Sequence, residues 1–342
     1  MSGERHDVLD GAVHPSETTR LFGHAAAEDF LAQSYRSGKG HHAILIEGPQ
    51  GIGKATLAFR FANHVLSHPD PADAPDRLAD PDPQSAVSRQ IAAGASHNLL
   101  HLTRPVDEKT GRVKAAITVD EVRKAGHFFA QTSGTGNWRI VIIDPADDLN
   151  RNAANAILKI LEEPPKRAMF LVLSHAPGRL LPTIRSRCLP LRLEALADED
   201  LRKALSALRL DPGPNADAVL AKAGGSVSEA IKLVNYGGMD IAEALSGVLD
   251  ASGPAARKAM HKLADVLSAK DSDVLHGFFT GHLENTVMMR ARSSALSGDL
   301  DAAERHARLA SDVQERLRLA QAYNLDRKQT IISLLEDVKA LG

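Results

Sequence analysis

One short stretch near residue 50 constrains the fold more than any other part of the chain. An apolar run over residues 42–46 breaks into a turn in which Gly48, Gly51, Gly53 and Lys54 match the pattern G-x-x-x-x-G-K. In such a P-loop the glycines let backbone N–H groups turn toward a phosphate, and the lysine neutralises that phosphate at the start of a helix. A strand, a glycine-rich turn and a helix in this order predict the first unit of a parallel α/β sheet.

The position after the lysine departs from this pattern. A serine or threonine is expected there, because its hydroxyl holds Mg²⁺, but the chain has Ala55. Thr56 follows one place too late to point in the same direction on a helix. We keep Thr56 as a candidate ligand-binding residue, and the loop is a candidate phosphate site without its usual metal-binding hydroxyl.

A second strand ends in an acid. Residues 138–144 form the clearest apolar run, and Asp144 closes it, which is typical of a Walker B motif whose aspartate supports Mg²⁺. The following residue is often a glutamate that polarises water, but here it is Pro145, which has neither a charge nor an N–H. Asp147 and Asp148 are candidate replacements, although both are also placed to cap the next helix, and capping is the role we expect.

Further apolar runs complete a β-α-β-α-β order over about 150 residues. This order predicts a doubly wound parallel sheet, with ligands bound at the carboxyl ends of its strands. Ser174 closes one of these strands. Besides the two described above, strands are predicted over residues 99–102, 169–173 and 189–193, and helices over residues 119–130 and 150–163.

After Glu194 the pattern changes to helices alone. Helices are predicted over residues 198–210, 216–223 and 226–234, and four more follow residue 254. The last one carries apolar residues at helical spacing from Ile331 to Leu341. This stripe indicates either the core of an intrachain bundle or a subunit interface, and the spacing does not choose between them.

Composition excludes several classes of protein. No apolar run approaches 18 residues, so no membrane span is expected, and the polar N-terminus lacks a secretory signal, which makes a cytoplasmic location the default. Cys188 is the only cysteine, so the chain alone cannot form a disulfide or a multi-cysteine zinc cluster. His97 and His101 flank a strand without completing a metal site. Residues 68–83 are rich in Pro and Asp and predict a surface insertion or flexible loop.

Two strings in the middle of the chain point to a family. The string NAILKILEEPP over residues 155–165, followed by FLVLS and then by LLPTIRSRC over residues 180–188, closely resembles the clamp-loader subunits of bacterial DNA polymerase III. The resemblance implies an α/β AAA+ P-loop module with a parallel sheet over residues 1–195. It also implies a small all-α lid over residues 196–250 and a C-terminal helical collar, used for oligomerisation, over residues 251–342.

This resemblance also implies roles for individual residues. Arg187, in the string Ser-Arg-Cys, matches the arginine finger that reaches the ATP of a neighbouring subunit. Ser174 matches a polar sensor and Asp144 the Walker B acid. The chain would then be a non-motor subunit that helps to load the sliding clamp onto primed DNA. Its expected partners are the motor (gamma/tau) and delta subunits, the clamp and primed DNA as part of the complex, without a membrane.

Three departures from the motor pattern agree with one another. Ala55 removes the Mg²⁺ hydroxyl, Pro145 replaces the catalytic acid, and residues 225–228 carry serine where motor subunits place a sensor arginine. We therefore expect no ATPase activity and no required cofactor, with ATP, ADP or phosphate as candidate ligands of the loop. No zinc is expected, because the cysteine-free insertion over residues 68–84 stands where many relatives have a four-cysteine zinc module.

The sequence is also compatible with two other functions. The chain could be an autonomous AAA+ ATPase or motor subunit, with Thr56 and Asp147 standing in for the missing groups. It could also be a nucleic-acid-binding module, because residues 139–193 carry nine Lys or Arg against five Asp or Glu. A low aromatic content of 4% argues against a base-stacking surface.

Overall fold

The computed structural model describes residues 9–107, 111, 113–130, 136–270 and 272–341. These residues fall into two compact units, Met1–Ile231 and Lys232–Gly342. The three-part division expected at residues 195 and 250 stays a prediction.

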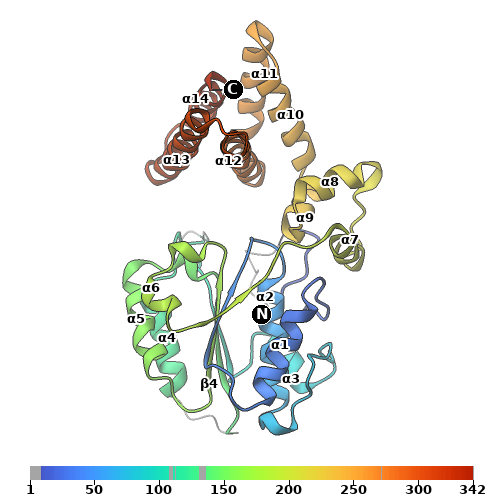
Figure 1. Cartoon of the computed structure of the whole chain (residues 1–342), viewed down its shortest axis with the longest axis vertical. Coiled ribbons are helices and arrows are strands. Elements are labelled where there is room, and N and C mark those ends of the chain that lie inside the picture. Colours follow the sequence, from blue (N-terminus) through green and yellow to red (C-terminus); the bar gives the residue numbers. More distant parts are fainter. Residues whose placement is uncertain (1–8, 108–110, 112, 131–135, 271, 342) are drawn as a thin grey trace. The chain divides into compact units, whose positions relative to one another are not determined.

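A five-stranded sheet forms the centre of the first unit (Figure 1). All neighbouring strands are parallel, in the order β2-β3-β4-β1-β5, so β1 lies inside the sheet between β4 and β5. The doubly wound parallel sheet expected for an AAA+ module is confirmed, and each predicted strand end lies within one residue of the observed end. The strands are β1 (Ala43–Glu47), β2 (Leu99–Leu102), β3 (Arg139–Ile143), β4 (Ala168–Ser174) and β5 (Leu189–Arg192).

Helices cover both faces of this sheet (Figure 1). Alternate residues of a strand point to opposite faces, so Ile44 and Ile46 of β1 pack with one set of helices while Ala43 and Leu45 pack with the other. Each face therefore has its own apolar core. One face carries α1 (Ala25–Arg36), α2 (Lys54–Ser67) and α3 (Ala86–Ala92), and the other carries α4 (Val119–Ala130), α5 (Arg151–Glu162) and α6 (Pro182–Arg185).

Three further helices follow the sheet, namely α7 (Asp198–Ala207), α8 (Ala216–Ala223) and α9 (Val227–Asn235). The helix predicted over residues 198–210 ends three residues early. Arg209 takes a φ of 58°, which is outside the helical region, and Pro212 cannot continue the helical hydrogen bonds.

The Pro- and Asp-rich insertion belongs to the first unit and contacts its helices α1 and α2. Most of it is exposed, as expected, but Ala74 is buried and the hydroxyl of Tyr35 donates a hydrogen bond to the carbonyl of His68. The buried Arg60 of α2 also reaches it, since its guanidinium lies 2.9 Å from Asp80 and 2.8 Å from Glu28 of α1. The insertion is thus an ordered part of the surface rather than a free loop.

The second unit is built from helices alone. Four apolar residues of its last helix, Ile331, Leu334, Leu335 and Val338, are fully buried within this unit. The stripe that the sequence left open is therefore the core of an intrachain bundle. The helices are α10 (Gly238–Asp250), α11 (Gly253–Leu267), α12 (Asp273–Leu296), α13 (Leu300–Tyr323) and α14 (Arg327–Ala340).

Across the described parts of both units, no helix is long and apolar enough to cross a membrane. Among these same residues, no group of three His, Cys, Asp or Glu side chains is arranged to hold a metal ion.

Candidate functional site

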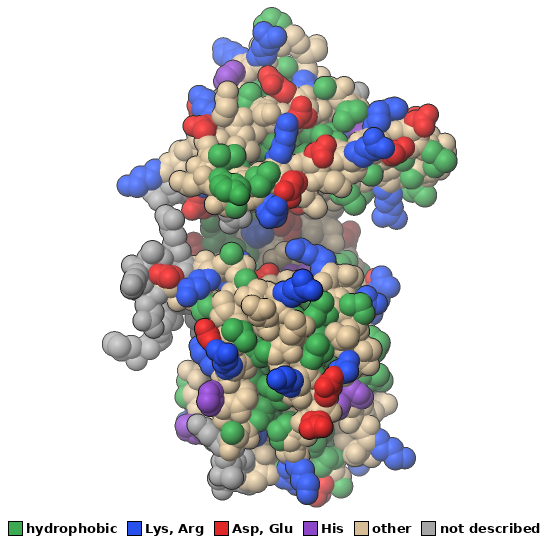
Figure 2. Space-filling model, turned by 90° about the vertical axis from the view of Figure 1, so that its left-hand side faces the viewer, with side chains coloured by type: hydrophobic (Ala, Val, Ile, Leu, Met, Phe, Trp, Pro, Cys, Tyr) green, Lys and Arg blue, Asp and Glu red, His purple; other side chains and the backbone are tan. Residues whose placement is uncertain are grey.

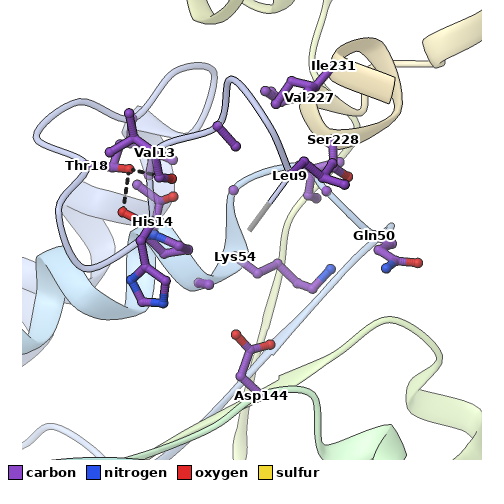
Figure 3. A pocket seen from close by; sticks show the side chains of 18 of the residues that line it. Leu9, Val13, His14, Thr18, Gln50, Lys54, Asp144, Val227, Ser228 and Ile231 are labelled. Atoms are coloured by element: carbon purple, nitrogen blue, oxygen red, sulfur yellow. Dashed lines mark hydrogen bonds between the residues drawn. The ribbon is translucent and has the colours of Figure 1, made fainter. Parts of the chain in front are cut away.

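A cavity of about 940 Å³ in the first unit contains most of the residues singled out from the sequence (Figure 3). The P-loop lines it together with the carboxyl end of β3, the start of α9 and residues from the segment 9–22. This is the edge of the sheet where a doubly wound fold binds its ligands. The location of the site is therefore the one that the order of strands predicts.

Lys54 begins α2 and turns back toward its own loop. Its ammonium group donates a hydrogen bond of 2.7 Å to the carbonyl of Gly48, and the residue is only 4% exposed. Burial lowers the pKa of Lys54 to about 8, an effect that Asp144 and Asp147 partly oppose. The lysine is thus mostly charged at neutral pH in a poorly hydrated place, where an anion would stabilise it.

The first turn of α9 closes directly onto the P-loop. The carbonyl of Gly51 accepts a hydrogen bond of 2.9 Å from the backbone N–H of Val227, and Gly51 has a φ of 76°. A β-carbon at Gly51 would lie 1.8 Å from the hydroxyl oxygen of Ser228 and 2.4 Å from that of Ser226. The serines at the place where motor subunits are expected to carry a sensor arginine therefore contact the P-loop itself.

A third carbonyl of the loop is held by His24. The Nε2 atom of this buried histidine lies 2.8 Å from the carbonyl oxygen of Ile52, and burial lowers the pKa of His24. In a trans peptide the N–H points opposite to the C=O, so the N–H of Gly53 faces away from His24. The carbonyls of Gly51 and Ile52 are thus held by other segments of the chain, whereas those of Gly48 and Pro49 accept hydrogen bonds from the Lys54 ammonium.

Asp144 faces the cavity below Lys54 (Figure 3). One carboxylate oxygen of Asp144 lies 3.5 Å from Nε2 of His101, which extends from β2. Pro145 follows Asp144 in the cavity wall, so no carboxylate occupies the place of the usual catalytic glutamate.

The capping role predicted for the next two acids is wrong. Asp147 accepts hydrogen bonds from the Ser174 hydroxyl at 2.9 Å and from the His175 N–H at 2.6 Å. Asp148 pairs with Arg104 at 3.1 Å, and burial raises the pKa of Asp148. A 3₁₀ turn over Ala146–Asp148 delays the start of the helix, so Asn150 caps α5 instead.

The bonds to Asp147 also define the role of Ser174. Ser174 is completely buried and does not line the cavity, whereas the adjacent His175 does. Burial lowers the pKa of His175, and the nearby charge of Lys54 lowers it further. Because the oxygens of Asp147 are engaged by the end of β4, this carboxylate ties two strands together and is poorly available as a general base.

Arg187 lies outside this cavity, in the turn between α6 and β5. Its side chain is 33% exposed and its Nη2 atom lies 2.5 Å from the Oε1 atom of Glu162. Its Nη1 atom donates a hydrogen bond of 2.8 Å to the carbonyl of Thr183. The guanidinium is therefore held in place yet accessible to another molecule.

The face of the first unit that carries α4, α5 and α6 has charges of both signs (Figure 2). Figure 2 shows the face of the first unit that carries α4, α5 and α6, where Lys and Arg side chains lie among acidic and hydrophobic ones. Lys and Arg side chains do not form one continuous basic surface on this face (Figure 2). This mixed surface gives no separate support to an independent nucleic-acid-binding module.

Most of the predicted ligand-binding residues meet in the cavity. Its lining includes Gly51, Gly53, Lys54, Thr56 and Asp144. Gly48 is not part of the lining, but its carbonyl accepts a hydrogen bond from Lys54. Ser174 is buried and does not line the cavity, and Arg187 lies outside the cavity, between α6 and β5.

Sequence reasoning missed other parts of the wall. His101 and His175 had a signal, because each lies at the carboxyl end of a strand. The segment 9–22 and His24 had none, since their sequence is polar and unpatterned before α1.

The three residues that depart from the sequence pattern of motor subunits lie around one cavity. Ala55, Pro145 and Ser228 all line the same cavity, although they are far apart in the sequence. The missing hydroxyl, the missing acid and the serine in place of arginine therefore affect one ligand site rather than three unrelated places.

Comparisons with known proteins agree on one family. Residues 23–197, just over half of the chain, match the family described as DNA polymerase III, delta subunit. The chain is 37% identical over 200 residues to the DNA polymerase III subunit delta' of Pseudomonas aeruginosa, which covers 57% of this chain and 56% of that protein. It is 30% identical over 233 residues to the delta' subunit of Escherichia coli, covering 66% of this chain and 64% of that protein.

Other similarities are more distant. The tau subunit of Escherichia coli DNA polymerase III is 28% identical over 235 residues, which cover 67% of this chain and 34% of that protein. The matches span between about half and two thirds of the two delta' relatives. A solved structure of a gamma subunit-related protein from Thermotoga maritima is 18% identical, with a TM-score of 0.46, and the match covers 91% of this chain and 98% of that one.

Proposed function

Because the chain belongs to the DNA polymerase III delta subunit family, we propose that it is a non-motor subunit of a bacterial clamp loader. In this proposal it assembles in the cytoplasm with the motor (gamma/tau) and delta subunits and helps to load the sliding clamp onto primed DNA. It presents Arg187 to the ATP bound by its neighbour and does not hydrolyse ATP itself.

One observation carries this proposal. Every departure from the motor pattern borders the cavity of the P-loop, whereas Arg187 lies outside that cavity and is partly exposed. A site without the metal-binding hydroxyl and without a general base cannot assemble the usual hydrolytic machinery. An arginine away from that site is instead available to a site on another subunit.

The chemistry of Arg187 suits this role. Its planar guanidinium matches the charge that spreads over the oxygens of a transferring γ-phosphoryl group. An arginine finger supplied in trans is worth a factor of ~10³ to 10⁵ in rate. Cys188, the next residue, is buried, and burial raises the pKa of its thiol to about 11, so the thiol stays protonated and takes no part.

The test uses the loader reconstituted from all of its subunits. With Arg187→Ala, we expect assembly to be normal and hydrolysis at the adjacent site, stimulated by clamp and DNA, to fall by ~10³ or more. Arg185→Ala is the matched control, because Arg185 is exposed and lies two residues earlier, at the end of α6. Normal turnover with Arg187→Ala would overturn the assignment.

The rival function, an autonomous ATPase, has less support. It needs Asp147 as a base, but that carboxylate accepts hydrogen bonds from Ser174 and from two backbone N–H groups. Single-turnover assays of the isolated chain should therefore show no hydrolysis that depends on Lys54. Hydrolysis that disappears with Lys54→Ala would favour the rival.

We also propose that the P-loop still holds a nucleotide or phosphate without a metal ion. The carbonyls of Gly51 and Ile52, which other segments hold, and the charged Lys54 support this, while Ala55 offers no ligand to Mg²⁺. Calorimetry with ADP should give the same affinity with Mg²⁺ and with EDTA. The affinity should fall above about pH 8, where free Lys54 loses its charge, and Lys54→Ala should abolish it.

A further inference from the structure

The guanidinium of Arg187 is bound on two sides by its own subunit. Its Nη2 atom meets the Oε1 atom of Glu162 at 2.5 Å, and its Nη1 atom meets the carbonyl of Thr183 at 2.8 Å. Glu162 is the last residue of α5 and is about half exposed. These two contacts orient the guanidinium plane, and the Nε atom takes part in neither of them.

We propose that Glu162 is a positioning residue for Arg187, an inference that rests on the proposed arginine finger. Arginine has a long side chain with many rotamers, and ordering them costs rate if it must occur during the reaction. A carboxylate that already holds Nη2 removes much of that cost. The guanidinium has five N–H donors, so donors remain for a neighbour's phosphate after both contacts are made.

The two residues are held by elements that pack against each other. Ile157 and Leu161 anchor α5 in the core beneath the sheet, and Ile184 anchors α6 in the same core. The Pro164-Pro165 pair follows the end of α5 and prevents the helix from continuing. The position of the Glu162 carboxylate relative to Arg187 is therefore set by buried contacts and not by the exposed ion pair alone.

The carboxylate of Glu162 also has an electrostatic effect, which opposes the effect of positioning. A carboxylate beside a finger reduces the positive potential that a phosphate meets, so a carboxylate that only screened Arg187 would slow the reaction. The two effects have opposite signs in the mutant. Removal of a positioning residue lowers the rate, whereas removal of a screen raises it.

The test measures clamp- and DNA-stimulated ATP hydrolysis by the reconstituted loader. With Glu162→Ala, we expect kcat at the adjacent site to fall three- to tenfold, while KM for ATP stays within twofold. Glu162→Gln should recover most of the loss, because its amide oxygen still accepts a hydrogen bond. Glu163→Ala, at the next position, which is also exposed, is the control and should leave kcat unchanged.

A double variant separates positioning from a general structural effect. On an Arg187→Ala background, Glu162→Ala should cause no further loss, because its effect passes through the arginine. An additive loss, or an unchanged or raised kcat in the single variant, would overturn the inference. If the loader with Arg187→Ala alone keeps normal turnover, the proposed function fails. If Arg187→Ala lowers turnover while Glu162→Ala leaves it normal, only the positioning role of Glu162 fails.

Discussion

The hydroxyl of Ser228 occupies the space that a side chain on Gly51 would need. A β-carbon at Gly51 would lie 1.8 Å from that oxygen, and the same glycine carbonyl accepts the N–H of Val227. The P-loop and the start of α9 are thus in direct backbone contact. A glycine is required at position 51 both for its φ of 76° and for this close approach.

Gly51→Ala should therefore destabilise the first unit by about 3 kcal/mol, the sum of a strained φ and a steric overlap. Gly38→Ala is the matched control, since Gly38 has a φ of 67° but open space around it, and it should cost about 1 kcal/mol. Urea unfolding followed by fluorescence of Trp138, the only tryptophan, reports on this unit alone. Equal losses would show that the contact with Ser228 contributes nothing.

Arg60→Met should destabilise the first unit by about 3 kcal/mol, because it leaves the carboxylate of Glu28 partly buried without its partner. Burial already raises the pKa of Glu28 despite the opposing effect of Arg60. Adding Glu28→Gln to Arg60→Met should restore part of the stability, measured again by Trp138 fluorescence. Strictly additive losses would mean that the pair is not coupled.

Lys339→Met should destabilise the second unit by about 2 kcal/mol. The ammonium of Lys339 donates to the carbonyls of Val248, Leu249 and Ala251 at the end of α10, at 2.9, 3.0 and 2.6 Å. Hydrogen exchange of the α10 amides should accelerate accordingly. Lys262→Met, on an exposed position of α11, should leave the exchange rates as they are.

The stability of the first unit should fall as the pH drops from about 6.5 toward 4. Burial, assisted by the neighbouring His68, lowers the pKa of His64 from 6.5 to about 4, so the unfolded chain takes up this proton first. The free energy of unfolding falls by about 3 kcal/mol over this whole pH range. Above pH 6.5 this loss is absent, because His64 is neutral in both the folded and the unfolded state.

His64→Leu should flatten this part of the profile, measured as the unfolding free energy at pH 7.5 and pH 5. Exposed His97→Leu should keep the original slope. His24 and His175 have pKa values lowered in the same direction, so some slope should persist in His64→Leu. An unchanged slope would contradict the role of His64.

Much of the fold follows from local patterns. The strands are short apolar runs bounded by turn residues, so their ends were predicted to within one residue, and the order of elements fixed a parallel sheet. The stripe from Ile331 to Val338 predicted a buried face, but which partner buries it depends on packing between distant helices. Spacing within one helix contains no information on that partner.

The site was less predictable because its geometry depends on distant segments. The P-loop residues and Asp144 were found from local motifs, whereas His24 reaches Ile52 across 28 residues. The role of Asp147 was missed for a local reason, since a 3₁₀ turn shifted the helix start to Asn150. Its contact with Ser174 joins the ends of two strands that only the folded sheet brings together.

The bond network of Lys339 has a consequence for how the chain is made. The end of α10 obtains these three hydrogen bonds only when residue 339 has been synthesised, roughly ninety residues after residue 248. Until α14 emerges from the ribosome, the helices before it lack four of the buried side chains of their shared core. A product that stops short of α14 should therefore expose an apolar groove and become a substrate for proteases before it can enter any assembly.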